Sequence, residues 1–161
     1  MVVSVAIVSP QPATSHELQR ALGEIDGLET QIVTLEVDIA IRRIARADVV
    51  VLHSELPDHT LMRLLRTLLF LPGTTLPVVV DAPDDPDILI GYLEHGVVGY
   101  VLASESRDRL REVVVGVTEG KGYINPAIAT LLIDRYRALR QRFRQHDRVE
   151  NDLPGRHAND D

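Results

Sequence analysis

The chain has 161 residues, of which 45% are hydrophobic and 4% aromatic, and its formal net charge is −7. This length suits one domain with a substantial aliphatic core, and the acidic balance argues against non-specific nucleic-acid binding by the whole domain. The lack of cysteine excludes disulfides, thiolate metal sites and cysteine nucleophiles. No apolar run reaches the roughly 18 residues of a membrane span, and the first residues read as a strand without a secretion signal, so we expect a cytoplasmic protein without membrane association.

Apolar, β-branched runs alternate with amphipathic stretches along most of the chain. The apolar runs predict five strands, at residues 2–8, 30–35, 49–52, 76–80 and 97–102. The stretches between them predict five helices, which begin near residues 14, 38, 58, 86 and 107. Thr14 and Glu17 have the spacing of a capping box, which predicts that they cap the first helix. A longer last helix is predicted from Pro126 to about residue 145.

This alternation predicts an α/β fold. We expect a doubly wound, five-stranded parallel sheet of the flavodoxin-like type, with strand order 2-1-3-4-5 and a long extra C-terminal helix. The expected divisions are a sheet-and-helix domain at 1–123, a C-terminal or linker helix at 124–146, and a tail at 147–161. We predict that the tail is disordered, because it is polar and interrupted by Pro154 and Gly155.

The run at residues 49–52 is expected to form a central strand that is buried on both faces. His53 follows it directly, at the carboxyl edge where sheets of this kind bind ligands. The imidazole can be phosphorylated, act as a pH switch or contact a ligand. We favour a plainer interpretation, in which His53 is half-buried and hydrogen-bonded to a polar neighbour. A hydrolase with Ser9 or Ser54 beside His53 is less favoured, because the sequence lacks a nucleophile-elbow glycine pattern.

Four segments, in order, resemble the receiver domain of bacterial two-component response regulators, of the kind attached to LuxR-type helix-turn-helix domains. They are residues 48–57 (DVVVLHSELP), 76–80 (LPVVV), 94–102 (EHGVVGYVL) and 120–129, where GKGY is followed by PAIA. The resemblance covers about residues 3–133 and implies that residues 1–123 form a receiver-like signalling domain.

The resemblance also implies a phosphorylation pocket, whose reactive groups this sequence lacks. A receiver has a phosphoacceptor aspartate after its third strand, where this chain has His53, and an acid pair after its first strand, where it has Ser9 and Pro10. A receiver ends its fourth strand with serine or threonine and its fifth with lysine, and the matching positions here are Ala82 and Ala103. Because Mg²⁺ prefers carboxylates and phosphoryl transfer needs cationic stabilisation, we expect a degenerate pseudo-receiver that is not an enzyme and uses no metal or cofactor.

Acidic residues gather after the third and fourth predicted strands, at Glu55, Asp58, Asp81, Asp84, Asp85 and Asp87. Such a group can hold Mg²⁺ or Ca²⁺. However, acids at a helix start ordinarily complement the helix dipole, and strand alternation predicts that Asp81 and Ala82 face opposite ways. We therefore favour helix-dipole roles over a metal site.

The last predicted helix has an apolar seam with spacings of 4, 3 and 4, formed by Leu132, Tyr136, Leu139 and Phe143. Its remaining surface is rich in arginine, at positions 135, 137, 140, 142 and 144. The seam predicts a helix that pairs with a second copy or connects to an output domain; the alternative is a solvated helix packed on its own domain. The arginine row lacks the aromatic interleaving of a nucleic-acid stacking surface, so we expect no direct nucleic-acid binding by this segment.

The preferred function is a phosphorylation-independent dimerisation or protein-interaction module in transcriptional regulation, with an attached or partner DNA-binding domain. The resemblance implies two further dimer surfaces, one from residues 18–25 with the fifth helix and one from Ile90 and Tyr92 with Tyr100. Tyr100 matches the switch aromatic of the family. The alternative function is a small-molecule sensor that binds a metabolite in the vacated pocket between Ser9, His53 and Ala82.

Overall fold

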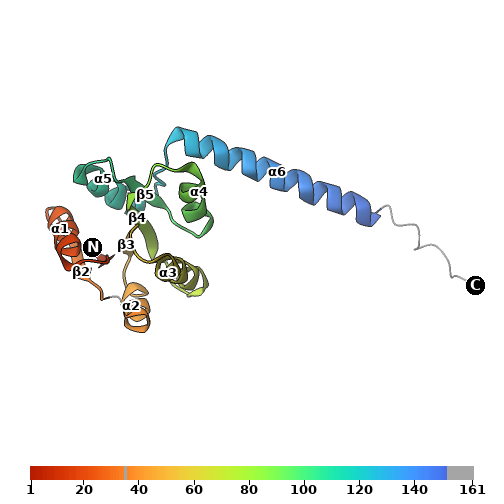
Figure 1. Ribbon diagram of the computed structural model, residues 1–161. Coiled ribbons are helices and arrows are strands. Elements are labelled where there is room, and N and C mark those ends of the chain that lie inside the picture. The colour runs from red at the N-terminus through yellow and green to blue at the C-terminus, as the bar shows by residue number, and fades with distance from the viewer. Residues whose placement is uncertain (35, 152–161) are drawn as a thin grey trace, which may run out of the picture. The chain divides into compact units, whose positions relative to one another are not determined.

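The computed structural model describes residues 1–34 and 36–151. Its centre is one sheet of five parallel strands in the order β2-β1-β3-β4-β5, as predicted (Figure 1). The strands are β1 (Val3–Val8), β2 (Leu28–Ile32), β3 (Val49–His53), β4 (Leu76–Ala82) and β5 (Gly99–Leu102). The helices between them are α1 (Pro12–Gly23), α2 (Val37–Ile44), α3 (Asp58–Phe70), α4 (Pro86–Glu94) and α5 (Arg107–Thr118).

Helices cover both faces of the sheet, with α1 and α5 on one side and α2, α3 and α4 on the other (Figure 1). The α1 and α5 side packs Leu18, Leu22 and Leu110 against alternate strand residues such as Val49 and Val51. Every residue of β3 is buried, because its intervening residues face the opposite layer. This two-sided burial explains why the central strand is an unbroken apolar run.

Two element boundaries differ from the sequence prediction for identifiable reasons. Helix α1 begins at Pro12, with Gln11 as N-cap and no side-chain cap, so the predicted capping box of Thr14 and Glu17 was wrong. Proline at the first helical position supplies the required φ angle and has no amide hydrogen to satisfy. Strand β4 continues to Ala82, two residues beyond the predicted end, and carries Asp81 into the site described below.

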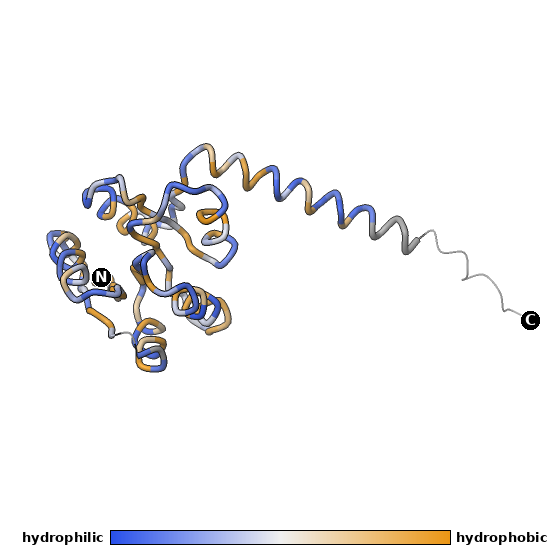
Figure 2. Tube along the Cα trace, in the orientation of Figure 1, coloured by the Kyte–Doolittle hydropathy of each residue, from blue (hydrophilic) through white to orange (hydrophobic). Residues whose placement is uncertain are grey.

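The chain divides into two compact units, and the second begins at Asn125. Its helix α6 (Pro126–Asn151) begins where the Asn125 Oδ1 accepts a hydrogen bond from the Ile128 amide at 2.9 Å. Hydrophilic and hydrophobic residues alternate along α6 as far as residue 145 (Figure 2). The helix continues into the segment predicted as a disordered tail, and residues 152–161 of that tail lie outside the described residues. Among the helices described, none combines the length and apolar character needed to span a membrane.

Candidate functional site

The candidate site lies at the carboxyl edge of the sheet, where β1, β3, β4 and β5 end. In the strand register, Val8 pairs with Leu52 and His53 pairs with Val80. The residues that follow these strands therefore lie along one edge. This is the edge at which open parallel sheets present ligand-binding residues.

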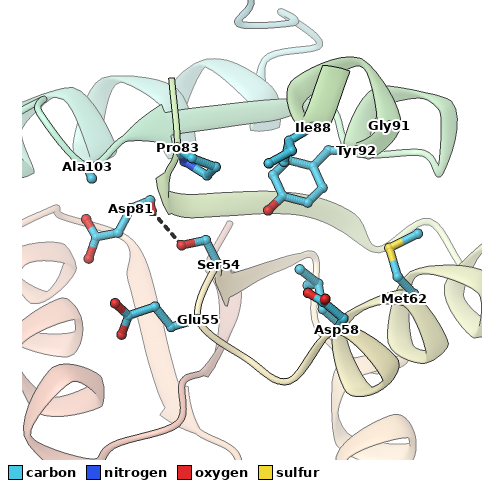
Figure 3. A pocket seen from close by; sticks show the side chains of 11 residues that line it. Ser54, Glu55, Asp58, Met62, Asp81, Pro83, Ile88, Gly91, Tyr92 and Ala103 are labelled. Carbon is cyan, nitrogen blue, oxygen red and sulfur yellow. Dashed lines mark hydrogen bonds between the residues drawn. The ribbon is translucent and has the colours of Figure 1, made fainter. Parts of the chain in front are cut away.

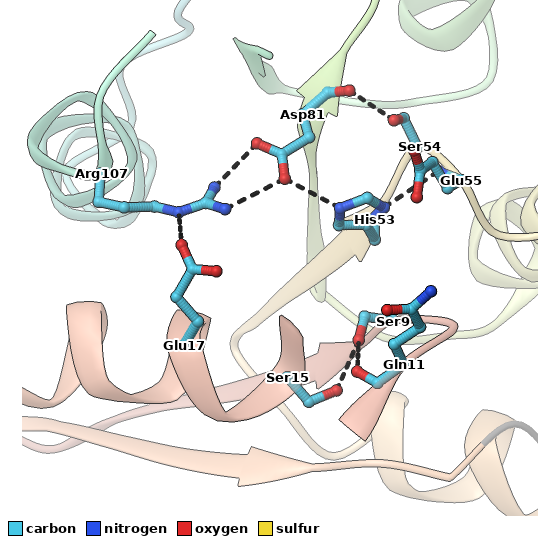
Figure 4. Close-up of polar contacts among 9 residues, drawn as sticks. All are labelled: Ser9, Gln11, Ser15, Glu17, His53, Ser54, Glu55, Asp81 and Arg107. Atoms are coloured by element: carbon cyan, nitrogen blue, oxygen red, sulfur yellow. Dashed lines mark hydrogen bonds and ion pairs between the residues drawn. The ribbon is translucent and has the colours of Figure 1, made fainter. Parts of the chain in front are cut away.

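The His53 side chain is 5% exposed and uses both ring nitrogens (Figure 4). Its Nδ1 accepts a hydrogen bond from the Glu55 amide at 3.1 Å, and its Nε2 lies 2.9 Å from Asp81 Oδ2. Because Nδ1 is an acceptor, the proton of the neutral ring resides on Nε2 and is donated to the carboxylate. A second proton on Nδ1 would face the Glu55 N–H donor and break that bond.

Asp81 is also held by Arg107, the first residue of α5. The guanidinium Nη1 lies 2.9 Å from Oδ1 and Nη2 lies 3.1 Å from Oδ2, while Nε donates to Glu17 Oε1 at 2.8 Å (Figure 4). Burial alone raises the pKa of Asp81, but the hydrogen bonds and charge of Arg107, with His53, outweigh it and lower the pKa below its ordinary value of 3.8. Burial alone lowers the pKa of Arg107, but its contacts with Asp81 and Glu17 outweigh this and raise the pKa above its ordinary value. Both groups are therefore charged at neutral pH.

Asp81 has an unusual backbone conformation, with a φ angle of 53°. The register between β4 and β5 shifts between Val79 and Ala82, which interrupts regular strand alternation at this point. Aspartate is one of the few residues other than glycine that tolerate the left-handed region. The irregular strand end brings the Asp81 carboxylate to His53.

Asp81, rather than Ala82, is therefore the β4 residue that belongs to this site, and the assignment of Ala82 needs correction. Ala82 is fully buried, and its carbonyl accepts the Ala103 amide at 2.9 Å. Sequence reasoning also missed Arg107 and Glu17. The one available signal was the position of Arg107, since a first-turn residue of α5 lies near the carboxyl edge.

The positions where a receiver would carry acids hold a closed hydrogen-bonded turn. Ser9 is 7% exposed; its Oγ donates to the Gln11 carbonyl at 2.8 Å and lies 2.6 Å from Ser15 Oγ. Pro10 contributes no polar side-chain atom. Among the side chains that the structure describes, no group of three or more histidine, aspartate or glutamate residues is placed to hold a metal ion. Asp85 caps α4 instead, since its Oδ1 accepts the Asp87 amide at 2.9 Å.

An open pocket of about 690 Å³ lies beside this network, between α3, α4 and the loops that follow β3 and β4 (Figure 3). Asp81 and Ala103 contribute to its rim. Ser9, His53 and Ala82, which were expected to enclose a vacated pocket, do not line it. The cavity lies closer to α3 and α4 than expected, because hydrogen-bonded side chains occupy the space around His53 and Ser9.

The residues proposed for dimer contacts on the sheet domain are buried. Leu18, Leu22, Ile90, Tyr92 and Tyr100 are each at most 8% exposed. These side chains pack in the core and leave little apolar area for a partner, and dimerisation through these two surfaces stays a prediction. In α6, by contrast, the seam residues Tyr136, Leu139 and Phe143 are exposed by 62%, 51% and 70%, and Leu132 is half-buried.

Comparison with known proteins gives a consistent result for the fold. No family model and no curated protein matches the chain. A LuxR-family two-component response regulator from Aurantimonas sp. SI85-9A1 superposes with a TM-score of 0.71 at 18% identity, over 84% of this chain and 99% of that one. The NarL receiver domain from Mycobacterium tuberculosis gives 0.65 at 19% identity, over 74% and 98% of the two chains. RcsB from Salmonella typhimurium gives 0.66 at 20% identity, over 81% and 68%.

Identities in this range establish the three-dimensional fold and nothing finer. The strand order, the helices on both faces and these superpositions agree on one architecture. The chain has the fold of a response-regulator receiver domain.

Proposed function

We propose that this chain is an atypical receiver that works without phosphorylation, as a dimerisation or protein-interaction module in transcriptional regulation. The observation that carries the proposal is the closed network of His53, Asp81 and Arg107. It occupies the strand ends where the sequence resemblance places a phosphoacceptor. A phosphoryl group needs an acceptor atom and positive charge to stabilise its transfer.

Neither requirement is met by the groups in the network. Both ring nitrogens of His53 are engaged, and both carboxylate oxygens of Asp81 accept hydrogen bonds. The charge of Arg107 is already balanced by Asp81 and Glu17. The network thus keeps the site in one arrangement through its own side chains, which supports a module whose state does not depend on a phosphate.

Helix α6 supplies the surface for association in this proposal. Its apolar seam and arginine-rich remainder suit a helix that pairs with a second copy and leaves the charged groups in water. Two heptads alone rarely hold a stable dimer, so we expect the receiver body to contribute a polar contact as well. A DNA-binding domain, attached or on a partner, would then be regulated through the dimer. One structural neighbour, from Staphylococcus aureus, is a DNA-binding response regulator of the LuxR family, which supports that partner class.

Light scattering tests the dimer. We expect the wild type to run as a dimer and a Leu139→Glu, Phe143→Glu variant to run as a monomer. The matched control is Gln141→Glu, Gln145→Glu, which adds two acidic residues to the other side of α6 and should remain dimeric. A monomeric wild type would refute dimerisation, and dimers in all three samples would exclude the seam as the interface.

Mass spectrometry tests the second half of the proposal. After incubation with acetyl phosphate and Mg²⁺, the intact mass should stay unchanged. A gain of one phosphoryl group, on any residue, would contradict a phosphorylation-independent function. The metabolite alternative, drawn between Ser9, His53 and Ala82, is not supported in that form, because the polar groups of Ser9 and His53 are already hydrogen-bonded.

A further inference from the structure

The pocket between α3 and α4 has the size and lining of a small-molecule site. Its volume of about 690 Å³ lies within the roughly 300–1,000 Å³ typical of such sites. Two helices contribute apolar side chains to the lining, Met62 from α3 and Ile88 from α4 (Figure 3), and Leu61 of α3 is a further lining residue. These side chains offer a contact surface for the apolar part of a ligand.

Tyr92 contributes the most specific polar group of the pocket. The residue is 8% exposed, and Figure 3 shows its hydroxyl directed toward the cavity. Within the described part of the chain, the Tyr92 hydroxyl has no hydrogen-bond partner. Every fully buried side-chain polar atom there has a partner, so the Tyr92 oxygen is not one of the fully buried atoms. The oxygen is therefore reached from the pocket itself. A buried tyrosine hydroxyl ordinarily has a partner, and this one faces a cavity from which a ligand atom can reach it.

The charge of the lining selects the sign of that ligand. Glu55 and Asp58 line the pocket and have no ion pair or hydrogen bond through their carboxylates within the described residues. Asp81 differs, because Arg107 pairs with its charge and His53 donates a hydrogen bond to it. The lining residues include no arginine, lysine or histidine. Asp58 lies in the first turn of α3, where the helix dipole favours its charged form. The charges of Asp58 and Glu55 have no cationic side chain beside them in the lining, and next to an apolar wall they favour a cation and disfavour an anion.

We propose that this pocket binds a small organic cation that joins an amine or guanidinium group to an apolar body. The cationic group lies near Asp58 and the Tyr92 hydroxyl, which can accept a hydrogen bond from it. The apolar body packs against Leu61, Met62 and Ile88. A bare metal ion does not fit this lining, because the described residues there offer too few clustered ligands.

An NMR titration of the full chain tests the proposal with three probes of similar shape. These are phenethylamine, which is cationic, 2-phenylethanol, which is neutral, and 3-phenylpropionate, which is anionic. We expect phenethylamine to shift the amide signals of pocket residues saturably, with an affinity at least about tenfold higher than the neutral probe. The anion should cause no saturable shift. No saturable shift with phenethylamine up to about 10 mM, or equal binding of all three probes, would overturn the proposal.

Two variants locate the binding. Asp58→Asn and Tyr92→Phe should each weaken phenethylamine binding by about fivefold or more. Asp84→Asn is the matched control, because it makes the same change in charge at an exposed residue outside the lining. It should leave the affinity unchanged within about twofold. If Asp58→Asn and Asp84→Asn weaken binding equally, the attraction comes from the net charge of the protein and the pocket is not the site.

Discussion

The ion pair between Arg107 and Asp81 is the interaction whose removal is most informative. Arg107→Leu removes two hydrogen bonds to Asp81, of 2.9 and 3.1 Å, and one to Glu17, of 2.8 Å, and it leaves the Asp81 carboxylate facing His53 alone. A hydrogen bond to a charged group contributes about 1.5–3 kcal/mol, whereas an exposed ion pair contributes about 0–1 kcal/mol. The Arg107 side chain is 27% exposed and the Asp81 side chain 22%, so the pair lies between these two cases. We therefore expect the free energy of unfolding to fall by about 2 kcal/mol, or about 6–8 °C in Tm.

The pH dependence of this loss follows from the direction of the Asp81 shift. Its pKa in the folded protein is lowered from 3.8. A carboxyl group of this kind stabilises the fold above its unfolded pKa, and that contribution disappears as the pH falls through the folded value. Urea unfolding at pH 7 should thus show the full difference between wild type and Arg107→Leu. The difference should shrink as the pH is lowered below about 3.8.

A double-mutant cycle with Asp81→Asn separates the pair from other effects. Asparagine tolerates the left-handed backbone of Asp81, removes the charge and replaces one acceptor oxygen with an NH2 group. If the pair acts as described, Arg107→Leu lowers the free energy of unfolding much less in the Asp81→Asn variant than in the wild type. Arg63→Leu is the control, since its contact with Asp38 is 3.9 Å long and both side chains are largely exposed; it should change stability by less than about 0.5 kcal/mol. Additive effects at positions 81 and 107, within about 0.5 kcal/mol, would refute the coupling.

Two further substitutions probe packing and capping. In Gly116→Ala, the added methyl group collides with the Tyr123 ring, so we expect a loss of about 1–3 kcal/mol in unfolding free energy. The control is Gly91→Ala, which also lies within a helix but has no atom within 4 Å of the new Cβ. It should raise the free energy of unfolding by about 0.5–1 kcal/mol. Equal effects of the two substitutions would refute the clash. Asp85→Ala removes the side-chain cap of α4 and should lower the unfolding free energy by about 1 kcal/mol. The exposed neighbour Asp84→Ala should be nearly neutral in the same urea titration, and a matching loss there would exclude capping as the cause.

Features encoded by local pattern were predictable from the sequence. The unbroken apolar run of β3 and the proline and glycine signals around the helices predicted the strands and helices. Their alternation predicted the doubly wound fold type, whose strand order is the one observed. Regular patterns failed at Asp81, because a positive φ angle and a register shift are not visible in strand alternation. The cap of α1 was misjudged because Pro12 starts the helix before Thr14 is reached.

The polar network was beyond sequence reasoning for a different reason. Glu17 and Arg107 are 90 positions apart, and their contact depends on the side-by-side packing of α1 and α5. Residues far apart in sequence carry no pairwise signal in a single chain. The sequence therefore predicts the sheet edge at which His53 lies, while the hydrogen-bond partners of His53 could not be predicted.

The backbone of the loop that follows β3 is held in place by successive hydrogen bonds. The Ser54 amide donates to the Val80 carbonyl at 3.0 Å, the Glu55 amide to His53 Nδ1, and the Leu56 amide to the His53 carbonyl at 3.1 Å. The Ser54 hydroxyl adds a bond to the Asp81 carbonyl. Three successive amides in a surface loop are thus protected, and their exchange with deuterium should be as slow as that of neighbouring strand residues. One rim of the cavity is then ordered before any ligand arrives, so binding there loses little conformational entropy.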